Sequence, residues 1–293
     1  MKKKIKRALL LFTFAILISG ALFPIIYIVS NSFMSSQELE ERYTEQSTFL
    51  NADEPHYGKL HYVRMSLVPE EFSTDSYNTI ALGNPTFWRS FWNSVIIIVP
   101  ILFFQLLLAP LTAYGFEMSS FRFKEVIFYF YIVVMMLPTL VTLVPNYLLT
   151  QWLGLSDSYL AVILPSILNP IGVFMIRQQL KSFPRSIIEA AELDGAGTFR
   201  IYRQVVLPNI KSSIAVSMLI IFCDNWNMIE QIQIFITGNY AKTLPVFLSL
   251  RSANISPFFL AASVVFVIPA VFVFAYAMHR INESGIYGKE VNK

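Results

Sequence analysis

The sequence predicts an all-α, polytopic membrane protein with six transmembrane helices. Its 293 residues are 55% hydrophobic and 14% charged, with a mean hydropathy of +0.55. This composition excludes an ordinary soluble domain. Apolar runs of roughly 20 residues, the length that a helix needs to cross a hydrocarbon core, give the predicted spans: residues 8–30, 90–114, 125–150, 157–179, 211–236 and 257–279.

The first predicted span follows five basic residues among the first seven, a pattern that also describes a secretory signal. The apolar run 8–30 is longer than a usual signal core and lacks a clear small-x-small cleavage site. We therefore expect residues 1–30 to form a short tail and a first helix that stays in the membrane.

The lysines and arginines are unevenly divided between the two sides of the predicted spans. Sixteen of the 22, Arg177 among them, are assigned to the side of the N-terminus, and 6 to the other side. Because cytoplasmic loops are enriched in these residues, we expect both termini, the tail 281–293 and the polar segment 181–210 to be cytoplasmic. The net charge of +3 reflects this topology, and no nucleic-acid partner is expected, because the basic residues are spread over loops.

The longest loop, residues 31–88, is predicted to be extracellular and is rich in Asp and Glu. We favour a solvated acidic surface for it. The alternative is that a loop longer than the usual connection folds in part and helps to receive an extracellular partner.

Residues for catalysis or metal binding are scarce. Cys223 is the single cysteine and lies in a predicted span, which excludes disulfides within the chain and thiol metal clusters. His56, His61 and His279 are too few and too scattered for a metal site. No Gly-x-x-x-x-Gly-Lys-Ser/Thr loop is present, so the chain is not expected to bind ATP by itself, and we expect it to hold no cofactor.

Prolines recur within the predicted spans. In a membrane such helix breaks are tolerated where neighbouring helices or a water-filled cavity satisfy the freed backbone groups. A bundle that bends around a pathway is one interpretation, and kinks that serve packing alone are the other. The prolines are Pro100, Pro110, Pro138, Pro145, Pro165, Pro170 and Pro269.

The fifth span carries an unusual number of polar residues. Asp224, Asn227 and Gln231 recur at spacings of three and four, so a continuous helix would place them on one face. Such groups in a membrane usually face a bundle interior or a cavity, so this face and Glu230 are candidates to line a translocation pathway. Two alternatives stay open: hydrogen bonds that join neighbouring helices, and an ion-gradient carrier that uses Asp224 and Glu230 as coupling groups.

A polar segment between the fourth and fifth spans is the strongest functional signal. Glu189-Ala190-Ala191-Glu192-Leu193 favours a short helix, and Gly195 and Gly197 permit a turn. A second helical run follows, and Leu207-Pro208 is predicted to mark the break before the fifth span. The small side chains of the two alanines would let the helix fit into a cleft. Glu189 and Asp194 could form charged contacts with a soluble partner at the edge of that cleft.

This segment resembles the cytoplasmic EAA loop of bacterial ATP-binding-cassette importer permeases. That loop has Glu-Ala-Ala, three residues, Gly, nine residues and Ile-x-Leu-Pro, and here Val205 replaces the Ile. Further stretches across residues 88–280 are similar to the carbohydrate-uptake branch of the family. They are Asn93-Ser94, the run from Pro138 to Pro145, Leu153-Gly154-Leu155, the run from Phe174 to Gln179, Phe183-Pro184 and the Asp224-x-Trp226-Asn227 cluster.

The resemblance implies the type I importer permease fold, with a permease core over residues 89–280, in the cytoplasmic membrane of a bacterium. It implies a non-enzymatic subunit that pairs with a second, different permease. An extracellular binding protein would deliver a carbohydrate, more specifically an oligosaccharide, and a related polyol or glycerol-phosphate-type solute is the alternative. Two ATPase subunits would hold ATP and Mg²⁺ and grip the EAA loops. The residues implied in ATPase coupling are Glu189, Ala190, Ala191, Asp194, Gly195, Leu207 and Pro208.

Overall fold

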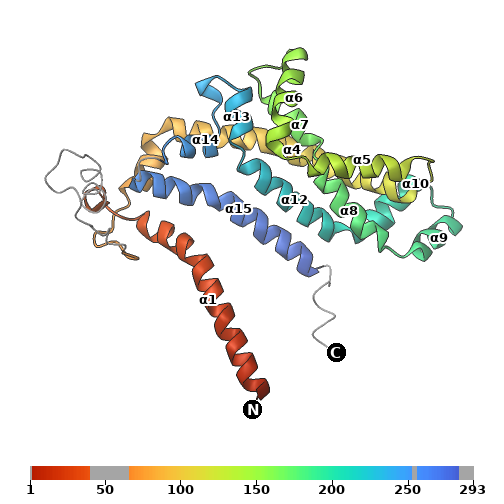
Figure 1. Cartoon of the computed structure of the whole chain (residues 1–293), viewed down its shortest axis with the longest axis horizontal. Helices are drawn as coiled ribbons and strands as arrows, with labels where there is room; N and C mark the ends of the chain where they lie inside the picture. Colours follow the sequence, from red (N-terminus) through yellow and green to blue (C-terminus); the bar gives the residue numbers. More distant parts are fainter. Residues whose placement is uncertain (1, 40–65, 253–255, 284–293) are drawn as a thin grey trace. The chain divides into compact units, whose positions relative to one another are not determined.

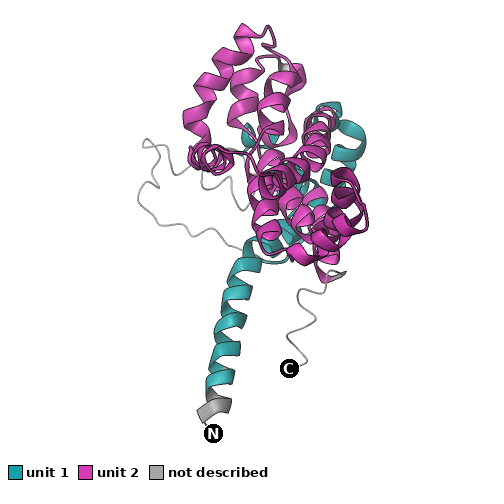
Figure 2. Cartoon of the chain, turned by 90° about the vertical axis from the view of Figure 1, so that its right-hand side faces the viewer, with its two compact units in different colours: residues 1–88, 247–268 teal, residues 89–246, 269–293 magenta. Residues whose placement is uncertain are grey.

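The computed structural model describes residues 2–39, 66–252 and 256–283 (Figure 1). These residues form helices and turns, and the one β-type pairing among them is an isolated bridge between Met34 and Phe72. The chain divides into two compact units, residues 1–88 with 247–268 and residues 89–246 with 269–293 (Figure 2). The predicted all-α architecture is confirmed.

Four segments of the described chain are long and apolar enough to cross a membrane on their own. They are α1 (Lys2–Asn31), α4 (Pro85–Met118), the segment Tyr159–Lys181 and α15 (Pro257–Glu283). Two bent helix pairs pass the same test, so the number of candidate spans rises to six if each pair is one span. This range includes the six spans predicted from hydropathy.

The predicted third span, residues 125–150, is not one straight helix. It consists of α5 (Lys124–Met136) and α6 (Thr139–Trp152), which meet at an angle of 103°. Leu137 and Pro138 between them have extended backbone, with ψ of 128° and 138°. Because a proline disfavours helical geometry in the residue before it, Pro138 accounts for the end of α5.

The predicted fifth span is also interrupted. Its helix α12 (Lys211–Trp226) ends ten residues before the predicted boundary, and α13 (Glu230–Phe235) follows as a separate short helix. At its other end α12 meets the preceding helical segment Thr198–Asn209 at 74°. The bend lies at the predicted start of the span, whereas the break after Trp226 falls inside it, where Asn227 and Glu230 interrupt the apolar run.

The fourth span is built from α7 (Tyr159–Ile167) and α8 (Ile171–Lys181) and still counts as one span. Gln105 on α4 is buried, and its Nε2 donates to the carbonyls of Ile167 at 2.7 Å, Asn169 at 3.0 Å and Ser166 at 3.4 Å. These are carbonyls at the interruption between α7 and α8. One amide from a neighbouring helix therefore satisfies the break that precedes Pro170.

The described ends of the long outer loop are folded within the first unit. Glu38 is buried, and its carboxylate accepts hydrogen bonds from the backbone N–H groups of Glu70 and Glu71, both at 2.9 Å. A short helix α3 (Asp75–Asn78) and a π-helical turn (Thr79–Gly83) then lead into α4. The prediction of a solvated acidic surface is wrong for Glu38, since its charge caps the backbone. Residues 40–65 of this loop lie outside the described residues.

Asn93 and Ser94 on α4 hold the segment between α13 and α14 (Leu244–Ser249). Asn93 Nδ2 donates to the carbonyls of Tyr240 at 2.9 Å and Lys242 at 3.0 Å, and Asn93 Oδ1 accepts from Tyr159 at 2.9 Å. Ser94 Oγ accepts from the Leu244 amide at 2.9 Å. The Asn-Ser pair thus satisfies backbone groups of the connection between α13 and α14 and the free amide at the start of α14.

Two apolar clusters hold the second unit together. One includes Ile97 of α4, Val162 of α7 and Ile221 of α12. The other includes Ala113 of α4, Ile176 of α8, and Ile201 and Ile210 from the segment before α12. The second cluster also packs against Ile188 and Ala191 of the polar segment 181–210.

Candidate coupling site

The Glu-Ala-Ala sequence lies in the middle of α9 (Arg185–Leu193). Pro184 precedes the helix with extended backbone, which suits a helix start. All nine residues of α9 are described, and none of them is buried. Its inner side, with Ile188 and Ala191 half-buried, packs against the second apolar cluster, whereas Glu189 and Ala190 are exposed.

The turn after α9 depends on Gly195. Its φ of +78° lies in the left-handed region, where an L side chain is strained. The amide of Gly195 donates to the Glu192 carbonyl at 3.0 Å, and that of Ala196 donates to the Ala191 carbonyl at 3.0 Å. These bonds satisfy carbonyls that the helix end leaves free. Asp194 is exposed at this helix end, so the predicted helix and turn are both present.

The second helical run contains α10 (Thr198–Ile201), a π-helical turn (Tyr202–Val206) and α11 (Leu207–Asn209). Leu207 is half-buried and Pro208 is exposed. Leu207 and Pro208 do not themselves form the predicted break, because both belong to α11, which continues the preceding π-helical turn. The break comes at the buried Ile210, whose φ and ψ are −104° and 12°.

Large apolar side chains are exposed on both helices of this segment. Leu193 is 89% exposed, Phe199 70% and Ile187 45%. Beneath them the Tyr114 ring of α4 lies 5.2 Å from the Tyr202 ring, and the Tyr114 hydroxyl donates to the Thr198 carbonyl at 3.4 Å. We call the exposed part of residues 185–200 the α9 surface. Tyr114 holds this surface to α4, and its apolar side chains are accessible to a partner.

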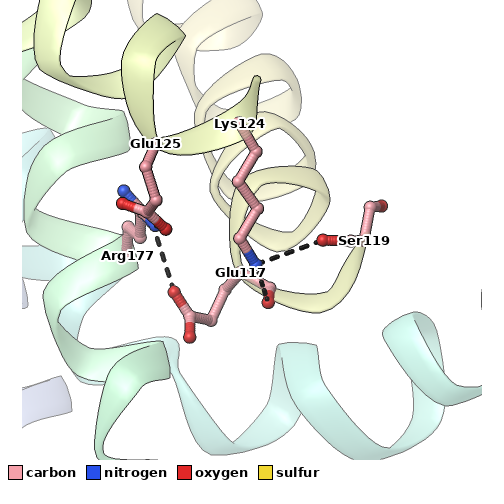
Figure 3. A network of polar contacts seen from close by, with 5 residues as sticks. All are labelled: Glu117, Ser119, Lys124, Glu125 and Arg177. Carbon is pink, nitrogen blue, oxygen red and sulfur yellow. Dashed lines mark hydrogen bonds and ion pairs between the residues drawn. The ribbon is translucent and has the colours of Figure 1, made fainter. Parts of the chain in front are cut away.

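Close to this segment, a charged cluster joins three helices (Figure 3). Arg177 of α8 is 1% exposed. Its Nε lies 3.2 Å from Glu117 Oε2 of α4, and its Nη2 lies 2.7 Å from Glu125 Oε1 of α5. Lys124 Nζ donates to the carbonyls of Glu117 at 3.3 Å and Ser119 at 3.1 Å. The cluster therefore fixes the α4–α5 turn against α8.

Arg177 was predicted to lie with the polar segment that follows the fourth span, and the structure corrects this placement. The residue lies inside α8, four positions before the end of the helix. Its guanidinium carbon is 3.8 Å from the centre of the Phe128 ring, a cation–π distance. The sequence signal was an arginine within an apolar span, with Glu117 and Glu125 at the facing ends of the two preceding spans.

The polar residues of the fifth span do not share one helical face. Asp224 lies on α12, Asn227 follows its last residue, and Glu230 and Gln231 begin α13. Asn227 Nδ2 donates to the Cys223 carbonyl at 2.7 Å, within the last turn of α12. Asp224, Asn227 and Glu230 are exposed and Gln231 is half-buried. Together they form a polar helix break, not a continuous stripe.

The candidate membrane spans, two of them bent, and the exposed segment 185–200 are the features of a multi-pass membrane subunit. Residues 105–285, more than half of the chain, match the model of the family described as binding-protein-dependent transport system inner membrane component. The chain belongs to this family and is a transport permease subunit. Neither this match nor the relatives described next support the ion-gradient carrier.

Characterised relatives are similar over most of the chain. The arabinooligosaccharides transport system permease protein AraQ of Bacillus subtilis (strain 168) is 28% identical over 220 residues, 73% of this chain and 77% of the relative. The lactose transport system permease protein LacG of Rhizobium radiobacter is 29% identical over 201 residues, 68% of this chain and 73% of the relative.

A solved structure has the same fold. It is a bacterial ABC transporter involved in the import of the acidic polysaccharide alginate, and one of its chains superposes with a TM-score of 0.74. The match covers 94% of this chain and 95% of the other at 22% sequence identity. The predicted importer permease fold is thereby confirmed.

Proposed function

We propose that this subunit forms half of the membrane pathway of an ATP-driven importer and that the α9 surface docks a separate ATPase. The observation that carries the docking role is an exposed helix on a firm base, with Leu193 and Phe199 open to solvent beside the turn at Gly195. A large exposed apolar patch on a polar segment is typical of a protein interaction site.

Each residue of the docking segment has a distinct role in this proposal. Glu189 and Ala190 face the ATPase directly, Ala191 lets α9 lie close to its base, and Asp194 and Gly195 shape the turn. Leu207 and Pro208 fix the exit toward α12 from within α11.

The remaining components follow from membership of a binding-protein-dependent system. A second permease completes the pathway, an extracellular binding protein delivers the solute, and two ATPase subunits hold ATP and Mg²⁺. This chain then needs no cofactor of its own. We place the chain in the bacterial cytoplasmic membrane with both termini and the α9 surface on the cytoplasmic side, as the distribution of Lys and Arg favours.

The proposed solute is a carbohydrate, and more narrowly an oligosaccharide. The names of the two relatives, arabinooligosaccharide and lactose permeases, support this class. The polar break between α12 and α13 is the proposed pathway lining, with Asp224, Asn227, Glu230 and Gln231. Exposed polar groups at an interrupted membrane helix are favourable where they border water or solute.

Docking is tested by purifying the tagged chain from its native membrane in mild detergent and identifying the bound proteins by mass spectrometry. Recovery of an ATPase and a second permease supports the proposal. Recovery of the chain alone, with transport driven by an ion gradient, would contradict it. The binding protein recovered in the same experiment can then be screened against oligosaccharides to identify the solute.

Gly195→Ala tests the geometry of the turn, and Gly154→Ala is its matched control. Both glycines have positive φ, +78° and +69°, with no atom near an added Cβ, so each substitution adds the same strain of about 1–2 kcal/mol. Only Gly195→Ala is expected to reduce the amount of ATPase recovered with the chain. Equal recovery with both variants would contradict a docking role for the Gly195 turn.

Glu189→Arg tests the charge on the α9 surface. Glu189 is exposed, so the substitution is expected to leave membrane insertion intact and to repel or obstruct the docked ATPase. ATPase recovery and ATP-driven uptake should both be lost. Full uptake by the variant would show that Glu189 has no role in docking.

A further inference from the structure

The buried cluster around Arg177 lies where the docking segment meets the membrane helices. α8 ends at Lys181, residues 182–184 form a short connection, and α9 begins at Arg185. The apolar cluster beneath α9 includes Val173, Ile176 and Leu180 of α8. α8 and α9 are therefore joined both along the chain and through packing.

α5 is attached to α8 through few side chains, and one of them, Tyr131, is half-buried against the second apolar cluster. Among its described residues Phe128 is the only buried one. Its ring packs under the Arg177 guanidinium at 3.8 Å and stacks on Phe174 of α8 at 6.4 Å between ring centroids. The ion pair of Glu125 with Arg177, at 2.7 Å, comes from the same helix. Two of the contacts that hold α5 to α8 thus converge on one side chain.

The chemistry of arginine suits this position. A planar guanidinium can engage two carboxylates at once while its face lies on an aromatic ring, which a lysine ammonium cannot do. Arg177 uses Nε for Glu117, Nη2 for Glu125 and its face for Phe128, while Nη1 is buried without a partner among the described residues. The arrangement restricts α4, α5 and α8 to one relative geometry.

We propose that Arg177 is a positioning residue that makes α5 move together with the docking helix α9. When an ATPase displaces α9, α8 moves with it, and the Arg177 cluster carries α5 along, so the displacement reaches the bend between α5 and α6. This inference rests on the proposed docking of an ATPase to the α9 surface.

The test is a distance between spin labels on α5 and α9, measured in the purified complex by pulsed electron paramagnetic resonance. Cys223, the single cysteine, is replaced by serine, and labels are attached at Tyr129, 66% exposed on α5, and Ser186, exposed on α9. Spectra are recorded without nucleotide and with Mg²⁺-ATP and orthovanadate. The wild-type distance is expected to be single and narrow in both conditions.

Arg177→Met removes the positive charge and the N–H groups of the guanidinium but keeps a long side chain. Its distance distribution is expected to broaden or shift when Mg²⁺-ATP and vanadate are added, since α9 then moves without α5. Arg122→Met is the matched control, because Arg122 is an exposed arginine in the same α4–α5 turn, and it should behave as wild type. A stability role alone would lower the yield of Arg177→Met without making its distance depend on nucleotide.

If Arg177→Met fails to assemble, the triple variant Glu117→Gln, Glu125→Gln, Arg177→Met replaces the whole cluster by neutral groups, which avoids an unpaired buried charge. A narrow, nucleotide-independent distance in the assembled variant would overturn the proposal, as would a nucleotide-dependent distance in the wild type. Failure of the docking proposal is separate, because then no ATPase is recovered with the wild-type chain.

Discussion

Two interrupted spans of the second unit behave differently. The α7–α8 span continues as one membrane segment through its interruption, whereas α5 and α6 meet at 103°. Both interruptions contain a proline, Pro170 in the first and Pro138 in the second. Proline alone therefore does not decide whether an interrupted membrane helix runs on or turns.

The environment of the free carbonyls differs between the two breaks. At the α7–α8 break they accept hydrogen bonds from buried Gln105, and the residues keep near-helical angles, with ψ of 10° at Leu168 and −14° at Pro170. The α5–α6 break is open, with Met136 74% and Leu140 68% exposed. A donor from a neighbouring helix keeps the first span together, and the second bends at an exposed site.

Of the three substitutions that probe these breaks, Gln105→Leu should lower the free energy of unfolding most. It removes the donor from three carbonyls in an apolar setting, which is expected to lower the free energy of unfolding by roughly 3 kcal/mol. SDS titration of the full chain in mixed micelles measures this loss. Gln151→Leu is the control, because Gln151 is exposed and bonds only locally to Tyr147 at 2.7 Å. Equal stability of the two variants would show that Gln105 does not hold the break.

Gly172→Ala should have an intermediate effect. A Cβ at this position would lie 3.1 Å from Gln105 Oε1 and 3.2 Å from both Ala109 Cβ and Ile221 Cδ1, so neighbours must shift. Overpacking of this kind costs about 1–2 kcal/mol. In a double-mutant cycle with Ile221→Val, which removes one close atom, the combined loss should be smaller than the sum. Strict additivity would contradict the close packing of α4, α8 and α12 here.

Pro138→Ala should have the smallest effect on stability. Pro138 is exposed, and exposed substitutions usually change the free energy of unfolding by less than about 0.5 kcal/mol. The same SDS titration tests this expectation. If Pro138→Ala lowered the free energy of unfolding as much as Gln105→Leu, the α5–α6 bend would be stabilised by packing, contrary to the comparison.

Features that depend on neighbouring residues were predictable from the sequence. Apolar length alone located the membrane helices, and Glu189 to Gly195 form the expected helix and left-handed turn because propensity and glycine φ act locally. The docking and pathway roles of these and the other predicted site residues stay predictions.

Features that depend on distant residues were not predictable. Arg177 meets Glu117 and Glu125 across 60 and 52 residues, and Gln105 meets its carbonyls across more than 60. The stripe from Asp224 to Gln231 was wrong because α12 ends at Trp226, and Asn227 leaves helical geometry with φ of −93° and ψ of 9°. A prediction from helical period assumes a continuous helix, and the end of α12 at Trp226 removes that continuity.

The exposure of Leu193 and Phe199 has a consequence for biogenesis. In the proposed arrangement, a newly inserted chain exposes these two side chains to the cytosol before the ATPase docks. Chaperones and proteases recognise such surfaces, so the two residues distinguish an orphan subunit from an assembled one. The half-life of the chain in cells should therefore follow the supply of its soluble partner, and replacing both residues by serine should remove that dependence.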